Sequence, residues 1–111
     1  AVAGVARKLV ELDTDVLLLC AGREGAFALE DAMCAGRIAR QVRELGVRLD
    51  GNDGLRAALQ LSTSQVTPRS LERTAAGRRL KEIGRYDDLV FCARENVHDA
   101  VPFLDEHRIR L

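Results

Sequence analysis

The sequence predicts a layered α/β/α domain with a small, mostly parallel sheet, and two observations lead to that expectation. Two apolar runs, Val16–Cys20 and Leu89–Ala93, contain no alternating polar residues. Continuous apolar runs of this length are typical of strands that helices cover on both faces. Stretches with helical periodicity surround both runs, so helices and strands are expected to alternate along the chain, as in α/β proteins.

A helix is expected at the start of the chain, over residues 2–12. Its apolar residues recur at helical spacing: Val2, Val5, Leu9 and Leu12. Polar residues 13–15 interrupt this pattern before the first expected strand. Residues 21–28 include two glycines and are expected to form a loop.

Residues 29–45 form the clearest expected helix, because Gly46 follows at the position where helices commonly end. A polar turn at residues 50–53 can cap a second helix over residues 53–63. The intervening residues 47–49 are expected to be a short extended piece.

A third long helix is expected to begin at Thr67 and Pro68. Threonine is a good N-cap, and proline is favoured at the first helical position. This helix should run to Ile83 and stop at Gly84. Beyond it we expect a loop, the second apolar strand, a helical turn and a short terminal strand, at residues 85–88, 89–93, 95–100 and 108–111.

A sheet of two or three strands is thin, and its edges need cover from another segment or another chain. The chain also begins with Ala1 and opens inside an expected helix. We therefore expect residues 1–111 to be a single α/β unit that is part of a larger domain. Pairing with an N-terminal part of that domain, or with a second copy, would complete the sheet.

Composition excludes several classes of protein. The 111 residues carry 17 basic and 17 acidic side chains, and hydrophobic residues make up 47%. Disordered chains are less hydrophobic, and no run approaches the ~20 apolar residues of a membrane helix. Nucleic-acid-binding domains usually carry a basic excess, and 4% aromatic residues leave few stacking platforms. The first residues have no charged n-region ahead of an apolar core, so they are not expected to be a signal peptide, and the protein is expected to be cytoplasmic, without a membrane or nucleic-acid partner.

The three cysteines do not indicate a disulfide framework or a zinc site. Cys20, Cys34 and Cys92 are odd in number, and no pair has C-x-x-C spacing. We expect them to be reduced, buried, small hydrophobic residues. His98 and His107 are expected to be ordinary polar residues and not ligands.

The loop before the long helix carries groups that suit an anion. Gly22 and Gly25 let backbone amides approach a ligand, and Arg23 offers a fork that matches phosphate or sulfonate oxygens. In open α/β sheets, ligands bind at such loops after strands, where helix N-termini attract anions. The alternatives are an ordinary surface arginine and plain turn geometry for the glycines.

Acidic residues beside this loop suit a divalent cation. Glu24, Glu30 and Asp31 supply the hard oxygen ligands that Mg²⁺ prefers. Asp31 is expected on the helix face that also carries Ala35, Ile38, Val42 and Leu45. A carboxylate at the head of an apolar stripe must be paired, capped or metal-bound, because burying it alone is costly. The alternative is that Glu30 and Asp31 only complement the helix dipole.

The stretch Cys20-Ala-Gly-Arg-Glu-Gly-x-x-x-Leu-Glu-Asp-Ala-x-Cys-Ala-Gly36 resembles a motif of the 2-phosphosulfolactate phosphatase family, the ComB-like proteins. Weaker likeness continues through Gly77-Arg78, Asp87-Asp88 and Val101-Pro102. The resemblance covers nearly the whole chain and corresponds to the C-terminal portion of the longer family members. The family often has Ser where this chain has Ala28, which removes a hydroxyl N-cap worth about 1 kcal/mol.

This resemblance implies a Mg²⁺-dependent phosphatase that converts 2-phospho-3-sulfolactate, or a related phosphate ester, to sulfolactate and phosphate in coenzyme M biosynthesis. It also implies that Arg23, Gly22 and Gly25 bind the substrate. Glu30 and Asp31 would hold the metal and, with Arg23, form the catalytic group, although a nucleophilic role for Asp31 stays open. Residues 1–111 alone are expected to have weak or no activity. The alternative is a non-enzymatic α/β module that binds a small anion or a protein partner.

Overall fold

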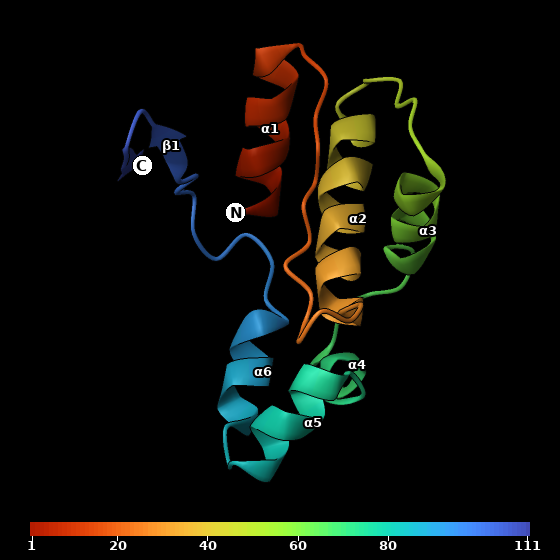
Figure 1. The fold of residues 1–111 in the computed structure, drawn as a ribbon, viewed down its shortest axis with the longest axis vertical. Coiled ribbons are helices and arrows are strands. Elements are labelled where there is room, and N and C mark those ends of the chain that lie inside the picture. The colour runs from red at the N-terminus through yellow and green to blue at the C-terminus, as the bar shows by residue number, and fades with distance from the viewer.

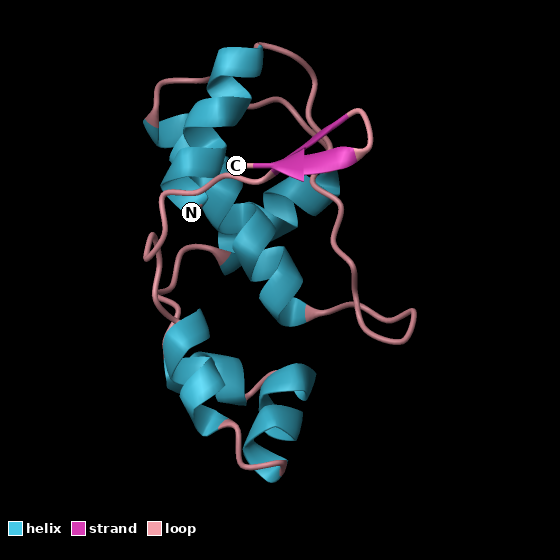
Figure 2. Ribbon diagram, turned by 90° about the vertical axis from the view of Figure 1, so that its left-hand side faces the viewer, coloured by secondary structure: helices cyan, strands magenta, loops and turns pink.

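The computed structural model describes residues 1–111 and is mainly helical, with one β-hairpin (Figures 1 and 2). The helices are α1 (Val2–Leu12), α2 (Leu29–Glu44), α3 (Asp53–Leu61), α4 (Pro68–Glu72), α5 (Ala75–Glu82) and α6 (Tyr86–Cys92). Strand β1 (Phe103–Asp105) pairs antiparallel with β2 (Arg108–Arg110). About half of the residues are helical. The chain therefore contains both helix and strand, but its one sheet is antiparallel.

The helices form two groups along the long axis of the molecule. Helix α2 contacts α1 on one side and α3 on the other, and α4, α5 and α6 contact one another. Figure 1 shows α4–α6 below the first group, with an extended segment descending between α1 and α2. None of the helices combines the length and apolarity that crossing a bilayer would need.

The α2–α3 contact is close because small residues line it. Gly36 is buried in α2, and a Cβ atom built on it would overlap the carbonyl oxygen of Ala58 in α3. Ala32 and Ala39 are also buried on this side of α2, one turn before and after Gly36. Helices approach this closely only where no large side chain separates their backbones.

Several expected helix boundaries are confirmed. The first helix spans Val2–Leu12, and Gly46 follows α2 with a φ of 92°. Thr67 caps α4 with a reciprocal pair of bonds to Ser70, and Pro68 is the first helical residue. Gly84, with a φ of 73°, ends α5. These signals are local, so they need no tertiary contact to act.

The third long helix was expected to be continuous, but it is interrupted at Thr74. The buried Thr74 side chain accepts a hydrogen bond from the Gly77 N–H at 3.0 Å and so caps a separate helix, α5. A Cβ atom on Gly77 would overlap the Leu71 carbonyl oxygen, so α5 meets the end of α4 at very short range. A continuous helix would not bring these two backbones together.

The two expected parallel strands do not form. Val16–Cys20 is extended but has no strand beside it. The second apolar run, Leu89–Ala93, lies in α6 and not in a strand. The expected loop at residues 85–88 is also wrong, because α6 begins at Tyr86. Asp87 and Asp88 lie in the first turn of α6, where their negative charges stabilise the positive end of the helix dipole. Leu89 is buried against the neighbouring helices.

Two smaller expectations are also corrected. Residues 95–100 form no helical turn, and a positive φ of 55° at Asn96 interrupts any helical path there. All three cysteines are exposed and not buried. Cys20 is exposed because nothing covers its extended segment. The expected terminal strand is confirmed as β2, over Arg108–Arg110.

We predict that Gly36→Ala destabilises the fold by about 1–3 kcal/mol, because the added methyl group overlaps the Ala58 carbonyl. Helix propensity alone would favour Ala over Gly by about 1 kcal/mol, so the sign of the change separates the two effects. Urea unfolding measures it. Arg43→Ala, on an exposed position of α2, is the control and should change stability by less than about 0.5 kcal/mol.

Candidate functional site

The loop before α2 is built around a tight turn at Arg23–Ala26. The Arg23 N–H donates to the Ala26 carbonyl at 3.0 Å, and the Ala26 N–H donates to the Arg23 carbonyl at 2.8 Å. The two central residues, Glu24 and Gly25, have φ values of 51° and 77°, as a type I′ turn requires. Gly22 has a φ of 69° and lies so near Ala26 that a Cβ atom would be 2.6 Å from its carbonyl oxygen.

One hydrogen bond fastens this loop to the start of α2. The Gly22 N–H donates to Oδ2 of Asp31 at 2.8 Å, and the bond is partly buried. Asp31 is half-buried in the first turn of α2. The expectation that this carboxylate needs a partner is therefore met by a backbone amide of the loop.

The buried face of α2 matches only in part the apolar face on which Asp31 was expected, since Val42 is the one residue of the expected set that is buried. The buried residues of α2 are Ala32, Met33, Gly36, Ala39 and Val42. This stripe lies beside the one expected, whose last member, Leu45, is 46% exposed. The small residues of α2 determine which face packs, because only they let α3 approach. Asp31 thus lies at the flank of the buried stripe.

The N-terminus of α2 has no side-chain cap. The N-cap residue is Ala28, in an extended conformation, and it has no hydroxyl group to accept from the first turn. Glu30 and Asp31 place negative charge at this end of the helix, where the macrodipole is positive. Backbone N–H groups of the first turn are left without an intrahelical acceptor and point toward the loop end of the helix.

The remaining predicted site residues are near this helix start but are not bonded to it. Arg23, Glu24 and Gly25 are exposed, Glu30 is half-buried, and none of the ion pairs in the chain involves Arg23 or Glu30. The structure thus joins Gly22 to Asp31 and places Arg23 next to Gly22 in sequence. No group of three or more His, Cys, Asp or Glu side chains is positioned to hold a metal ion.

Cys34 lies one helical turn after Asp31, and the pKa of its thiol is raised. Burial raises the pKa of the Cys34 thiol, and the negative charge of Asp31 raises it further. Although part of Cys34 reaches the surface, enough protein surrounds it to disfavour the thiolate. A thiol with a raised pKa is a poor nucleophile at neutral pH.

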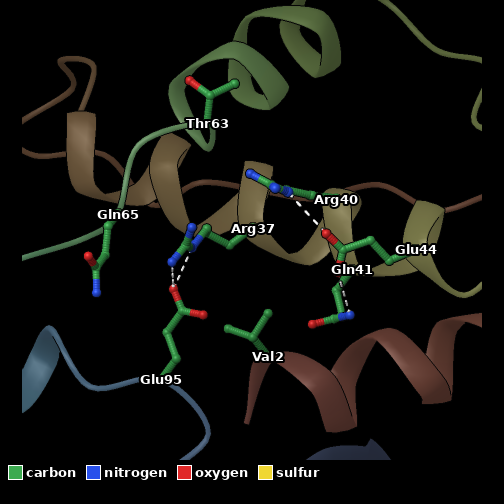
Figure 3. A pocket seen from close by; sticks show the side chains of 8 residues that line it. All are labelled: Val2, Arg37, Arg40, Gln41, Glu44, Thr63, Gln65 and Glu95. Carbon is green, nitrogen blue, oxygen red and sulfur yellow. Dashed lines mark hydrogen bonds and ion pairs between the residues drawn. The ribbon is translucent and has the colours of Figure 1, made fainter.

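A second polar region lies farther along α2 and was not predicted from the sequence. A cavity of about 340 Å³ lies between α2, the start of α1 and the chain after α3 (Figure 3). Its lining is almost wholly polar, with Val2 as the one hydrophobic residue. The residues that line it are Val2, Arg37, Arg40, Gln41, Glu44, Thr63, Gln65 and Glu95. Arg37 pairs with Glu95, and Arg40 pairs with Glu44 at 3.1 Å.

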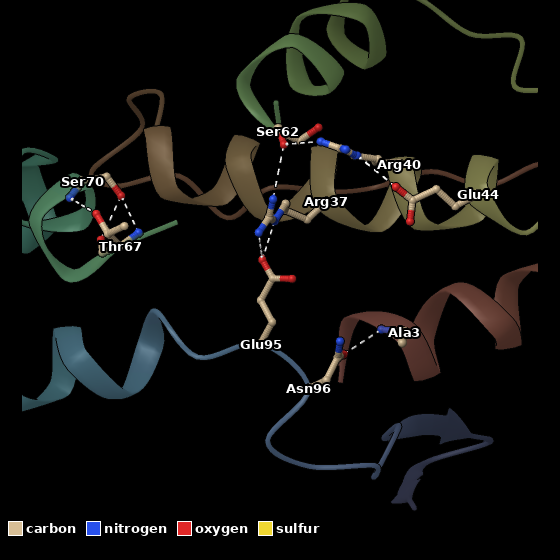
Figure 4. A network of polar contacts seen from close by, with 9 residues as sticks. All are labelled: Ala3, Arg37, Arg40, Glu44, Ser62, Thr67, Ser70, Glu95 and Asn96. Atoms are coloured by element: carbon tan, nitrogen blue, oxygen red, sulfur yellow. Dashed lines mark hydrogen bonds and ion pairs between the residues drawn. The ribbon is translucent and has the colours of Figure 1, made fainter. Parts of the chain in front are cut away.

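The two arginines of this cavity, Arg37 and Arg40, hold the C-terminal end of α3 against α2. Both donate to the Ser62 carbonyl oxygen, Arg37 at 3.3 Å and Arg40 at 3.2 Å (Figure 4). Ser62 is the C-cap of α3, so the arginines bring positive charge to its negative end. The sequence signal was the i, i+3 spacing of Arg37 and Arg40, which places both on one face of α2.

Comparison with known proteins identifies relatives of this chain. Residues 2–107 match the profile of a family described as 2-phosphosulpholactate phosphatase. A Thermus thermophilus protein named "Probable 2-phosphosulfolactate phosphatase" is 37% identical over 105 residues, which are 94% of this chain and 43% of the relative. A Synechocystis protein of the same name is 38% identical, over 78% of this chain and 37% of the relative. The chain thus spans less than half the length of these relatives.

We predict that Ala28→Ser stabilises the chain by about 1 kcal/mol, because the hydroxyl group can accept from the uncapped first turn of α2. Thermal and urea unfolding measure the change. Ala26→Ser is the matched control, since it adds the same hydroxyl group at an exposed turn residue outside the N-cap. Equal effects of the two substitutions would contradict the capping explanation.

We also predict that alkylation of Cys34 requires a higher pH than that of an ordinary thiol, because burial and Asp31 raise its pKa. Asp31→Asn removes the nearby negative charge, so the pH midpoint of the alkylation rate should fall. Glu30→Gln is the control: Glu30 is not among the groups that raise this pKa, so the midpoint should stay unchanged. The rate is measured with iodoacetamide and peptide mass spectrometry from pH 7 to 10.

Proposed function

Because this chain belongs to the 2-phosphosulpholactate phosphatase family, we propose that it supplies the anion-holding part of a phosphate monoester hydrolase. The proposed substrate is 2-phospho-3-sulfolactate or a related phosphate ester, which is cleaved to the alcohol and phosphate. The names of the relatives support this reaction class. In that case the reaction would serve coenzyme M biosynthesis, in the cytoplasm.

The observation that carries the proposal is the loop fastened over the start of α2. Gly22 is bonded to Asp31, so the turn that carries Arg23 is anchored beside an uncapped helix N-terminus. Such a terminus attracts anions, and a guanidinium fork binds phosphate or sulfonate oxygens in pairs. A substrate with both a phosphate and a sulfonate group presents several anionic oxygens to this arrangement.

The glycines contribute through the backbone. The N–H groups of Glu24 and Gly25, at the tip of the turn, donate to no group of the protein. They are therefore available to an anionic oxygen of the substrate. A side chain at Gly22 would collide with Ala26, so this position must stay open for the turn to form.

Mg²⁺ is the proposed cofactor, and the donor set suits it. Asp31 uses Oδ2 for the Gly22 amide and keeps Oδ1 free, and the Glu30 carboxylate makes no hydrogen bond or ion pair. One or two carboxylates, together with water and substrate phosphate, are the usual ligands of Mg²⁺ in phosphoryl-transfer sites. When bound, the ion would polarise the phosphoryl group and lower the charge that an attacking water meets.

In the proposed reaction, Arg23, Glu30 and Asp31 have separate roles. Arg23 holds the phosphoryl oxygens and offsets the negative charge that grows as water attacks phosphorus and the ester P–O bond breaks. Asp31 keeps the loop in place through Gly22, and its free oxygen faces the metal. Glu30 and Asp31 together hold the metal.

A non-enzymatic module that binds a small anion is the second candidate. It is favoured by one observation: the acidic residues of this chain form no group of three that could hold a metal ion. The loop and the helix start would bind phosphate or sulfate in the same way without turnover. Calorimetric titration of the full-length protein with sulfate, with and without Mg²⁺, measures anion binding. An assay of phosphate release from the ester by the same protein then distinguishes the two candidates, since only the enzyme releases phosphate.

We predict that Arg23→Ala and Asp31→Ala each lower kcat/KM by about 100-fold for the protein in its natural full length. The assay is phosphate release from 2-phospho-3-sulfolactate, with Mg²⁺ or with EDTA, and EDTA should abolish it. Arg43→Ala, an exposed arginine of the same helix, is the control and should retain full activity. Residues 1–111 alone should release little phosphate. Full activity in the Arg23 and Asp31 variants would refute the assignment.

A further inference from the structure

The extended segment between α1 and α2 carries unused backbone hydrogen-bonding groups. No backbone N–H or C=O group of residues 14–21 takes part in a hydrogen bond within the chain. The next residue, Gly22, is held by Asp31, so the segment is anchored at its C-terminal end. A backbone that is extended, anchored and unpaired on both sides is a template for strand pairing.

The side chains of the segment are those of an interior strand. Leu17 is 82% exposed and Leu19 is 87% exposed, whereas Leu18 between them is half-buried. Alternate residues of a strand point to opposite faces, so Leu17 and Leu19 share one uncovered face. On the other face only Leu18 is partly covered, because Val16 is 47% exposed and Cys20 is exposed. Phe27, in the following loop, is also exposed, at 75%.

The whole chain has more surface than a folded monomer of its mass. A 12.2 kDa monomer is expected to have roughly 6,100 Å² of accessible surface. This chain has 8482 Å². The difference, roughly 2,400 Å², is the area that one partner covers in a large obligate interface.

From these observations we propose that Val16–Cys20 is a strand of a sheet that the rest of the family chain supplies. The relatives contain more than half of their length outside the region matched here, enough for a layer of strands and helices. Such a part can pair with both edges of the segment and cover the Leu17 and Leu19 face. This inference rests on family membership and does not depend on the proposed catalysis.

A second copy of this chain fits the segment less well. Two copies of Val16–Cys20 would pair along one edge only and form a two-stranded sheet, which is marginal in water. Each copy would keep its other edge unpaired and its leucine face without a covering layer. The surface excess is therefore better matched by a partner that brings its own strands.

Hydrogen exchange of the Val16–Cys20 amides tests the proposal. The probes are residues 1–111 alone and a chimera in which these residues replace the matching region of the intact Thermus thermophilus relative. We expect exchange to be roughly 100-fold slower in the chimera, because its strand neighbours protect the amides. If the chimera does not fold, the aligned segment of the intact relative is measured instead, and fast exchange there overturns the proposal.

Two further results decide between partners. In the chimera, Leu17→Asp with Leu19→Asp should lower Tm clearly, whereas Leu12→Asp, at a 55% exposed position of α1, should not. Equal effects on Tm would refute a covered leucine face. In residues 1–111 alone, exchange should not depend on concentration. Slowing with concentration, lost in the Leu17 and Leu19 variant, would instead assign the segment to a second copy.

Discussion

The close contact between α2 and α3 is the constraint on which the rest of the structure depends. Gly36 lets the backbone of α2 reach the Ala58 carbonyl, and this fixes which face of α2 is buried. Arg37 can then reach both the end of α3 and Glu95, which ties the C-terminal part of the chain to α2. The same choice of face leaves Asp31 at the flank, where it can bond the loop. One glycine thus orients both the scaffold and the candidate site.

Much of the helical architecture could be predicted, because its signals are local. Thr67, Pro68, Gly46 and Gly84 act through the backbone of the adjoining turn, and all four mark real helix ends. The apolar runs could not be assigned in the same way, since a short apolar run suits a strand or a buried helix equally. Leu89 and its neighbours form helix α6, in which Leu89 is buried, whereas Val16–Cys20 is extended and has no strand beside it.

The candidate site was predicted in part. The sequence indicated a glycine-containing loop and a carboxylate at Asp31 that needs a partner, and the Gly22 amide supplies that partner. Which stripe of α2 is buried could not be read from hydrophobicity, because Ala32, Gly36 and Ala39 are weakly hydrophobic and pack through their small size. The arginine pair on Ser62 was missed for a similar reason, since its acceptor is a backbone carbonyl and carries no sequence signal.

The bond between Ala3 and Asn96 has a consequence for the order of folding. The Ala3 N–H donates to Oδ1 of Asn96 at 2.9 Å, across 93 positions of sequence (Figure 4). Closing so long a loop costs entropy before it gains contact energy, whereas α2–α3 and α4–α6 join neighbours in sequence. The two helical groups should therefore assemble first and independently. The Ala3–Asn96 and Arg37–Glu95 contacts would then act as late closures that convert two local units into one cooperative molecule.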